Sequence, residues 1–131
     1  MNKLNRLLLA VILALGLAPL TKAQNMPTGL TMGTTVNANI SAGQTYFYLL
    51  LSGGSVTTFN FTSNTGNPVN PQLITVVFQQ DSSGSRTVGY GSMFSSAATC
   101  APNATANKYT ICTFFYDSAS QLWYNLALAH N

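Results

Sequence analysis

Few side chains in this sequence are suited to catalysis. Its 131 residues include a single histidine, His130, and only two acids, Asp81 and Asp117. A hydrolase with a serine nucleophile needs a histidine base held beside that serine, but His130 is the penultimate residue, in a terminus expected to fray. The sequence also contains no G-x-S-x-G motif. We therefore predict a protein without enzymatic activity or cofactor, and keep a small secreted hydrolase as the last alternative.

Both aspartates instead precede segments that are typical of turns. Asp81 is followed by Ser-Ser-Gly-Ser and Asp117 by Ser-Ala-Ser. An aspartate at the first position of a turn accepts hydrogen bonds from the backbone N–H groups that follow it. Gly84 stands where the turn needs a residue that tolerates positive φ. Arg86 can reach back to Asp81 in an exposed ion pair worth roughly a few tenths of a kcal/mol. We predict structural roles for all four residues.

The two cysteines, Cys100 and Cys112, are candidates for a disulfide. An even number of cysteines in an exported chain favours an intrachain bridge. Closing a loop of about 13 residues would stabilise the fold by roughly 3 kcal/mol. Two free thiols and a bridge between chains are the alternatives. The spacing does not match a metal site, and further ligands are lacking, so we predict no bound metal.

Aromatic side chains are the remaining means of binding a ligand. Tyr90, Trp123 and Tyr124 could present ring faces to the apolar C–H faces of a sugar. The alternative is that these rings pack in the core or against neighbouring strands. The first interpretation makes them ligand contacts, and the second makes them structural residues only.

These residues must be positioned by β-strands, because no stretch after residue 23 repeats apolar side chains at helical spacing. Short segments rich in Thr, Val, Phe and Tyr are separated by clusters of Gly, Ser, Asn and Pro, which is typical of a small all-β domain. We predict one domain over residues 24–131, an antiparallel β-sandwich or a jelly-roll-like fold. The last segment could also form a short helix. The expected strands are Thr34–Ile40, Thr45–Leu51, Val56–Thr62, Leu73–Gln80, Arg86–Gly91, Tyr109–Asp117 and Gln121–Ala129.

The segment Tyr46–Leu51 consists of six consecutive aromatic or aliphatic residues. A strand places alternate side chains on opposite faces. Such a segment is therefore either covered on both faces inside the fold, or covered on one face by another copy of the chain. The second arrangement predicts a homo-oligomer, with Tyr48 and Leu50 facing outward.

The first 23 residues have the layout of a Sec signal peptide. Lys3 and Arg6 form a positive n-region, an apolar stretch follows over residues 7–18, and Thr21 and Ala23 are the small residues before the cleavage site. A membrane anchor is the alternative, but a spanning helix needs roughly 20 apolar residues. We predict cleavage after Ala23, which gives an extracellular or periplasmic protein with no membrane contact in its mature form.

Removing this peptide changes the charge of the protein. The whole chain has a formal net charge of +3, from five Lys or Arg against two acids. Loss of Lys3, Arg6 and Lys22 leaves two cations, Arg86 and Lys108, against the two aspartates, for a net charge of zero. Two isolated cations do not form the basic cluster that nucleic acid or an anionic membrane requires. A neutral surface with few charges instead favours association.

The residues from Ile74 to Val88 resemble the signature of a known family. An apolar strand ending in Gln-Asp, a Ser/Gly turn and a strand that begins Arg-Thr-Val are similar to the strand–turn–strand motif of a small β-domain in phage tail-fibre and head-fibre proteins. Thr113–Asp117 and the Trp123-Tyr124 pair resemble the closing hairpin of the same family. The resemblance covers the chain from about Val56 to its end. It implies a β-rich presentation domain, often multimeric and expected as a trimer, with no catalytic residue.

Taken together, the sequence predicts an exported, non-enzymatic β-domain in surface structure or adhesion, fibre-like and homo-oligomeric. Its expected partners are copies of itself and a cell-surface glycan or receptor. A secreted carbohydrate-binding module is the alternative, and it requires Trp123 and the tyrosines to be exposed on one face.

Export can be tested directly. N-terminal sequencing of the exported protein should find a new terminus close to residue 24, because the n-region, apolar stretch and small residues define a cleavage site there. Recovery of the chain in the membrane fraction with residues 1–23 still attached would show that this segment is an anchor.

Overall fold

The computed structural model describes residues 27–41, 43–63, 72–96 and 100–131. This part of the chain contains eight strands and no helix, and therefore no helix long and apolar enough to cross a membrane. The prediction of an all-β fold is confirmed. The predicted signal peptide lies outside the described residues.

Most strands coincide with the segments that the sequence predicts. The last segment is a strand and not a helix, β6 is shorter than expected, and the two-residue β1 was not predicted. The bounds are β1 Thr28–Gly29, β2 Thr35–Asn39, β3 Tyr46–Leu51, β4 Val56–Thr62, β5 Leu73–Gln80, β6 Val88–Tyr90, β7 Tyr109–Asp117 and β8 Leu122–His130.

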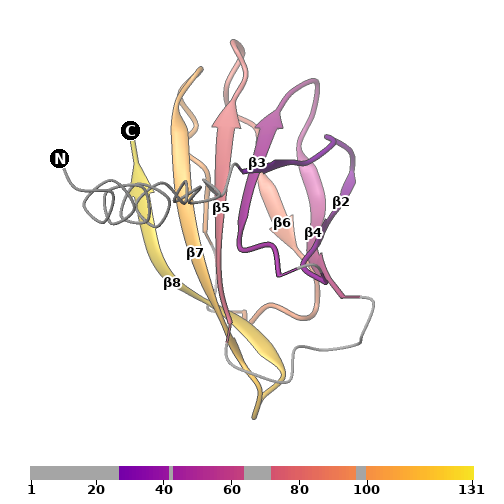
Figure 1. The fold of residues 1–131 in the computed structure, drawn as a ribbon. Helices are drawn as coiled ribbons and strands as arrows, with labels where there is room; N and C mark the ends of the chain where they lie inside the picture. The colour runs from indigo at the N-terminus through magenta and orange to yellow at the C-terminus, as the bar shows by residue number, and fades with distance from the viewer. Residues whose placement is uncertain (1–26, 42, 64–71, 97–99) are drawn as a thin grey trace, which may run out of the picture.

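From β1 to β7 the chain alternates between two sheets (Figure 1). The odd-numbered strands and β8 form a five-stranded sheet in the order β1-β3-β5-β7-β8, and the even-numbered strands form a three-stranded sheet in the order β2-β4-β6. The pairs β1/β3, β3/β5, β2/β4 and β4/β6 are parallel, whereas β5/β7 and β7/β8 are antiparallel.

The expected antiparallel arrangement, which a jelly roll also has, is therefore wrong for four of these six strand pairs. Parallel neighbours need a crossover connection, which is usually a helix. In this fold the crossover is a strand of the opposite sheet: β4 connects β3 to β5, and β5 connects β4 to β6. The sequence does not reveal this, because a strand has the same alternation of side chains whichever sheet it joins.

The inner faces of the two sheets share one hydrophobic core. Phe59 and Phe61 of β4 are both buried, and their rings contact the opposite sheet. The ring of Phe59 lies 5.5 Å from that of Phe78 in β5, and the ring of Phe61 lies 4.6 Å from that of Trp123 in β8. Such ring pairs contribute about 0.5–1.5 kcal/mol each beyond the area that they bury. The aromatic contacts therefore hold the three-stranded sheet against the five-stranded one.

The side chain of Gln80 holds the turn between β5 and β6. This amide is only 1% exposed. Its Nε2 donates to the carbonyl oxygen of Arg86 at 2.8 Å, and its Oε1 accepts from the Arg86 backbone N–H at 3.0 Å. A buried amide with both ends paired avoids the penalty of unsatisfied polar groups. The Gln80 side chain therefore pairs both backbone groups of Arg86, as the backbone of a neighbouring strand would.

Asp81 holds the same turn from its exposed side. The carboxylate accepts hydrogen bonds from the backbone N–H groups of Ser83, Gly84 and Gly53, and its Oδ2 lies 3.2 Å from Nη2 of Arg86. Partial desolvation acts to raise the pKa of Asp81, but these hydrogen bonds outweigh it and hold the pKa below its usual value. Asp81 thus both pairs with Arg86 and caps the turn.

Asp117 caps the turn between β7 and β8 in a similar way. Its carboxylate accepts hydrogen bonds from the hydroxyl group and backbone N–H of Ser120 and from the backbone N–H of Ala119. These bonds, the Ser120 hydroxyl first, lower the pKa of Asp117. Both aspartate carboxylates therefore accept hydrogen bonds from turn residues.

Gly84 is fixed by close backbone packing. Its φ is +67°, and a Cβ at this position would lie 2.6 Å from the carbonyl oxygen of Ala104 and 2.7 Å from the nitrogen of Ala106. The next residue, Ser85, donates its N–H to the same Ala104 oxygen at 2.7 Å. The turn after β5 is thus packed against the loop that leads into β7, and only glycine fits there.

Replacing Gly84 by alanine should lower the free energy of unfolding by more than about 2 kcal/mol, because the left-handed backbone alone costs an alanine roughly 1–2 kcal/mol and the methyl group also collides with backbone atoms. Gly53→Ala is the matched control, since Gly53 has φ +71° but no described atom lies within 4 Å of its Cβ position. Denaturant unfolding measures both losses. Equal losses would show that packing against Ala104 does not constrain the turn.

Candidate functional site

The outer face of the five-stranded sheet carries a shallow groove between tyrosine side chains. Its volume is about 340 Å³. Strands β3, β5, β7 and the end of β8 all contribute to it. The lining residues are Tyr46, Tyr48, Val77, Tyr109, Ile111, Ala129, His130 and Asn131.

The strand register brings these residues together. Tyr48 is directly opposite Val77 in β5, Val77 is opposite Ile111 in β7, and Ile111 is opposite Ala129 in β8. Side chains of directly opposed residues lie on the same face, with Cβ atoms about 4.5–5.5 Å apart. These four residues therefore form one continuous apolar row across four strands.

Several large apolar side chains on this face are open to solvent. The exposed fractions are 41% for Leu50, 55% for Leu73, 39% for Tyr109 and 44% for Ile111. Single exposed apolar residues are ordinary, whereas several on one sheet face are typical of an interaction site. The predicted alternation of Tyr46–Leu51 is present: Phe47, Leu49 and Leu51 are buried, while the other three side chains face outward.

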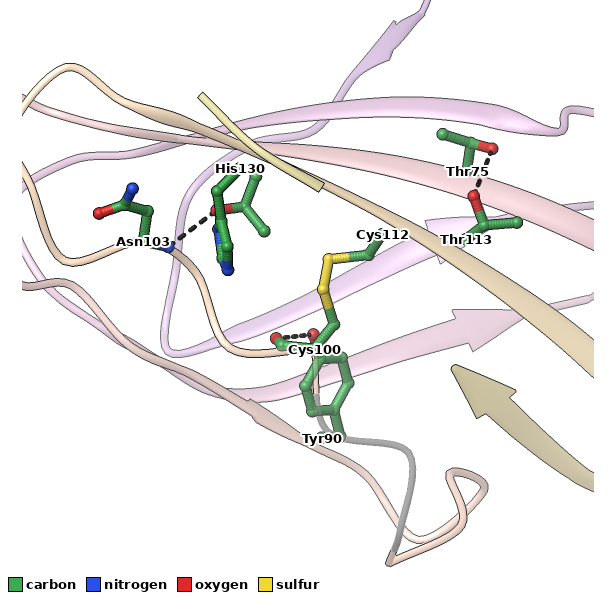
Figure 2. The surroundings of a disulfide bond; sticks show 8 residues. Thr75, Tyr90, Cys100, Asn103, Cys112, Thr113 and His130 are labelled. Atoms are coloured by element: carbon green, nitrogen blue, oxygen red, sulfur yellow. Dashed lines mark hydrogen bonds between the residues drawn. A yellow bond between two sulfur atoms is a disulfide. The ribbon is translucent and has the colours of Figure 1, made fainter. Parts of the chain in front are cut away.

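Two pairs of polar side chains on this face are joined to each other. The Tyr48 hydroxyl donates a hydrogen bond to Oε1 of Gln79, and the hydroxyl oxygens of Thr75 and Thr113 lie 3.5 Å apart (Figure 2). Desolvation by burial, and the neighbouring Tyr109 to a smaller extent, raise the pKa of Tyr48. The Tyr48 hydroxyl therefore stays neutral at physiological pH and acts here as a hydrogen-bond donor.

Formal charges are confined to the ends of the strands. Asp81 and Arg86 lie in the turn after β5, Lys108 precedes β7, and Asp117 is the last residue of β7. They are the four charged side chains among residues 27–131. The middle of the outer face therefore carries no charge.

His130 is held by a threonine and not by a carboxylate. Its Nδ1 lies 3.0 Å from the hydroxyl oxygen of Thr110, which also accepts a hydrogen bond from the backbone N–H of Asn103 at 2.8 Å (Figure 2). Thr110 is 1% exposed. A histidine that acts as a base needs an accessible nucleophile on one side and an orienting group on the other. The contacts of His130 instead fasten the end of β8 to β7.

Cys100 and Cys112 form a disulfide within the chain (Figure 2). Their Cα atoms are 6.0 Å apart, and both residues are fully buried. The bridge attaches the loop before β7 to the middle of that strand. Tyr90 supports the same loop, because its hydroxyl donates to the carbonyl oxygen of Cys100 at 2.7 Å. In the described part of the chain, no three His, Cys or acidic side chains lie close enough to hold a metal ion.

The structure does not bring the predicted ligand aromatics onto one open face. Trp123 is fully buried between Phe61 and Tyr116, so a sugar cannot reach its ring, and this ligand assignment is wrong. The Tyr90 ring packs in the core, where burial strongly raises the pKa of its hydroxyl. Tyr124 is partly exposed, and its hydroxyl donates to Ser120.

Five residues of the groove were not identified from the sequence: Val77, Tyr109, Ile111, Ala129 and Asn131. Their residue types are ordinary for a strand or its end, and they are brought together by the pairing of β5 with β3 and β7 and of β7 with β8. The one sequence feature that pointed to this face is the apolar stretch Tyr46–Leu51, which predicted an outward-facing apolar surface on its own strand.

The described residues form an all-β domain with its charged side chains at the ends of strands and an apolar sheet face. Comparison with protein families identifies the class of domain. The chain belongs to the family described as "Putative phage tail fibre C-terminal domain", whose model matches residues 24–121. The resemblance to phage tail-fibre domains is thereby confirmed. The comparisons with curated proteins and with solved structures give no match.

The disulfide should be present in exported protein and should stabilise it. Replacing Cys100 and Cys112 together by alanine should lower the free energy of unfolding by about 3 kcal/mol, the value expected for opening a loop of about 13 residues. Denaturant unfolding of the variant and the parent measures this loss, and non-reducing peptide mapping should find the bridged pair. Two free thiols in the exported parent protein would contradict the assignment.

Proposed function

We propose that this protein is an exported, fibre-type structural domain that assembles with copies of itself through the outer face of the five-stranded sheet. The observation that carries this proposal is the concentration of exposed apolar side chains, Leu50, Tyr109 and Ile111 among them, on a face whose middle carries no charged side chain. The family supports a structural role in a fibre. The predicted signal peptide supports action outside the cytoplasm, in the periplasm or at a cell surface.

Covering this face would cost little in polar desolvation. The hydroxyl of Tyr48 is already bonded to Gln79, and the threonine hydroxyls of β5 and β7 face each other. Groups that are paired before association lose no hydrogen bond when water leaves. Removing apolar surface from water contributes roughly 25 cal/mol per Å², which favours covering the face.

The absence of charge also favours identical partners. When two copies of one surface meet around a symmetry axis, each charged residue near the axis lies close to the same residue of the other copy. The two like charges then repel each other. On this face the central residues, such as Tyr48 and Val77, are neutral, so copies approach without repulsion. A trimer is the assembly that the resemblance to phage fibre domains implies.

Glycan binding at the same groove is the second candidate. The observation that favours it is the set of three tyrosines, Tyr46, Tyr48 and Tyr109, around a groove that also contains His130 and Asn131. Aromatic faces with a few polar groups are the usual lining of small-molecule sites. The two functions compete for one surface, and a solution measurement of mass separates them.

Replacing Tyr48 or Leu50 by aspartate should convert the oligomer into folded monomers, because an unpaired charge would then lie in an apolar interface. Asn37→Asp is the matched control. Asn37 lies on the other sheet, and its Oδ1 accepts a hydrogen bond from Asn60 Nδ2 that a carboxylate oxygen can also accept. Light scattering of each purified protein gives the mass.

The unmodified protein and Asn37→Asp should have the same multimeric mass. If the unmodified protein is monomeric at high micromolar concentration, assembly through this face is wrong. Loss of glycan binding in a monomeric Tyr109→Ala variant, with binding retained by Asn37→Asp, would then establish the second candidate.

A further inference from the structure

Four buried polar atoms lie at one end of the core without a hydrogen-bond partner among the described residues: Gln72 Oε1, Tyr116 Oη, Trp123 Nε1 and Asn125 Oδ1. Tyr116 and Trp123 are themselves 0% exposed. Native proteins rarely leave buried polar groups unpaired, and an ordered water molecule is the usual partner when no protein group is available. Four such atoms on neighbouring residues therefore need a hydrogen-bond partner that the described residues do not supply.

The backbone places these four side chains together. The N–H of Tyr116 donates to the carbonyl oxygen of Gln72 at 2.9 Å, which sets the residue before β5 beside β7. Tyr116 is directly opposite Trp123 in β8, and Asn125 follows Trp123 by two residues and is opposite Phe114. Opposed residues, and residues two apart in one strand, share a face of the sheet. All four side chains are therefore on the inner face.

The surroundings of the cluster are aromatic and uncharged. The indole ring of Trp123 lies 4.6 Å from the ring of Phe61 and 5.1 Å from that of Tyr116, measured between ring centroids. Asp117 is the nearest acid along the chain, and its carboxylate is engaged by Ala119 and Ser120. A site without a counter-charge does not suit an ion, because burying an unpaired charge is costly. The occupant should be small and neutral.

The hydrogen-bonding capacity of the four atoms matches that of water. Trp123 Nε1–H can only donate, the Tyr116 hydroxyl can donate, and the oxygens of Gln72 and Asn125 can only accept. A water molecule accepts two hydrogen bonds and donates two. We propose that a buried water molecule accepts from Trp123 and Tyr116, donates to Gln72 and Asn125, and so joins the start of β5 to β7 and β8.

The single tryptophan of the chain gives a direct test. In purified protein labelled with ¹⁵N, the Trp123 indole gives one N–H resonance, and its nuclear Overhauser effect to the water signal can be measured. A cross-peak with the sign of a long-lived bound water is the expected result. Absence of any such cross-peak would overturn the proposal.

The cross-peak between the Trp123 indole and the water signal could also arise from a tyrosine hydroxyl proton that exchanges with water. Two variants separate this source from a bound water molecule. Tyr116→Phe removes one of the four bonds, so the cross-peak should persist while the indole proton resonance shifts. Tyr124→Phe is the matched control, because the Tyr124 hydroxyl is at the surface on Ser120 and its loss should leave the resonance in place. Loss of the cross-peak in folded Tyr116→Phe alone would mean that the tyrosine proton was its source, which contradicts the proposal.

If that variant does not fold, a high-resolution crystal structure decides by the presence or absence of a water molecule within hydrogen-bonding distance of Trp123 Nε1.

Discussion

The hydrogen bonds between the Gln80 amide and the backbone of Arg86 hold the point where the chain leaves the five-stranded sheet for the three-stranded one. A fold whose strands alternate between sheets must turn in this way after almost every strand, and each turn exposes backbone groups that no neighbouring strand can pair. Here a buried side chain pairs them, Asp81 caps the turn, and Gly84 allows it to pack against the loop before β7. The Gln-Asp…Gly…Arg pattern that resembles the fibre family therefore has a structural role, which is to hold the turn after β5.

The alternation of side chains was enough to predict an all-β domain and the positions of most strands, because a strand that faces a core must bury every second residue. Phe59 and Phe61 in β4 are an example. Strand pairing was not predictable in the same way. The sequence of β3 does not indicate that β5 will be its parallel neighbour, since that depends on β4 joining the opposite sheet. The antiparallel prediction failed for this reason.

In the candidate site, too, local features could be predicted from the sequence, and features that depend on strand pairing could not. Both aspartates accept hydrogen bonds from the turn residues that follow them, because turn chemistry is local. The ligand assignment of Trp123 failed because burial depends on which strand covers it, and Phe61 of the other sheet does so. The groove itself depends on register, which sets Tyr48, Val77 and Ile111 in one row. With the charged side chains at the strand ends, the outer face is left apolar and neutral.

The central claim is that copies of this chain cover that outer face. The most direct measurement is the relaxation of side-chain protons by a soluble paramagnetic compound, followed as protein concentration increases. The account predicts that Tyr109 and Ile111, both partly open in the single chain, become protected on assembly, while Asn37 on the outer face of the three-stranded sheet remains equally accessible. Unchanged accessibility at all three residues in the assembled protein would contradict it.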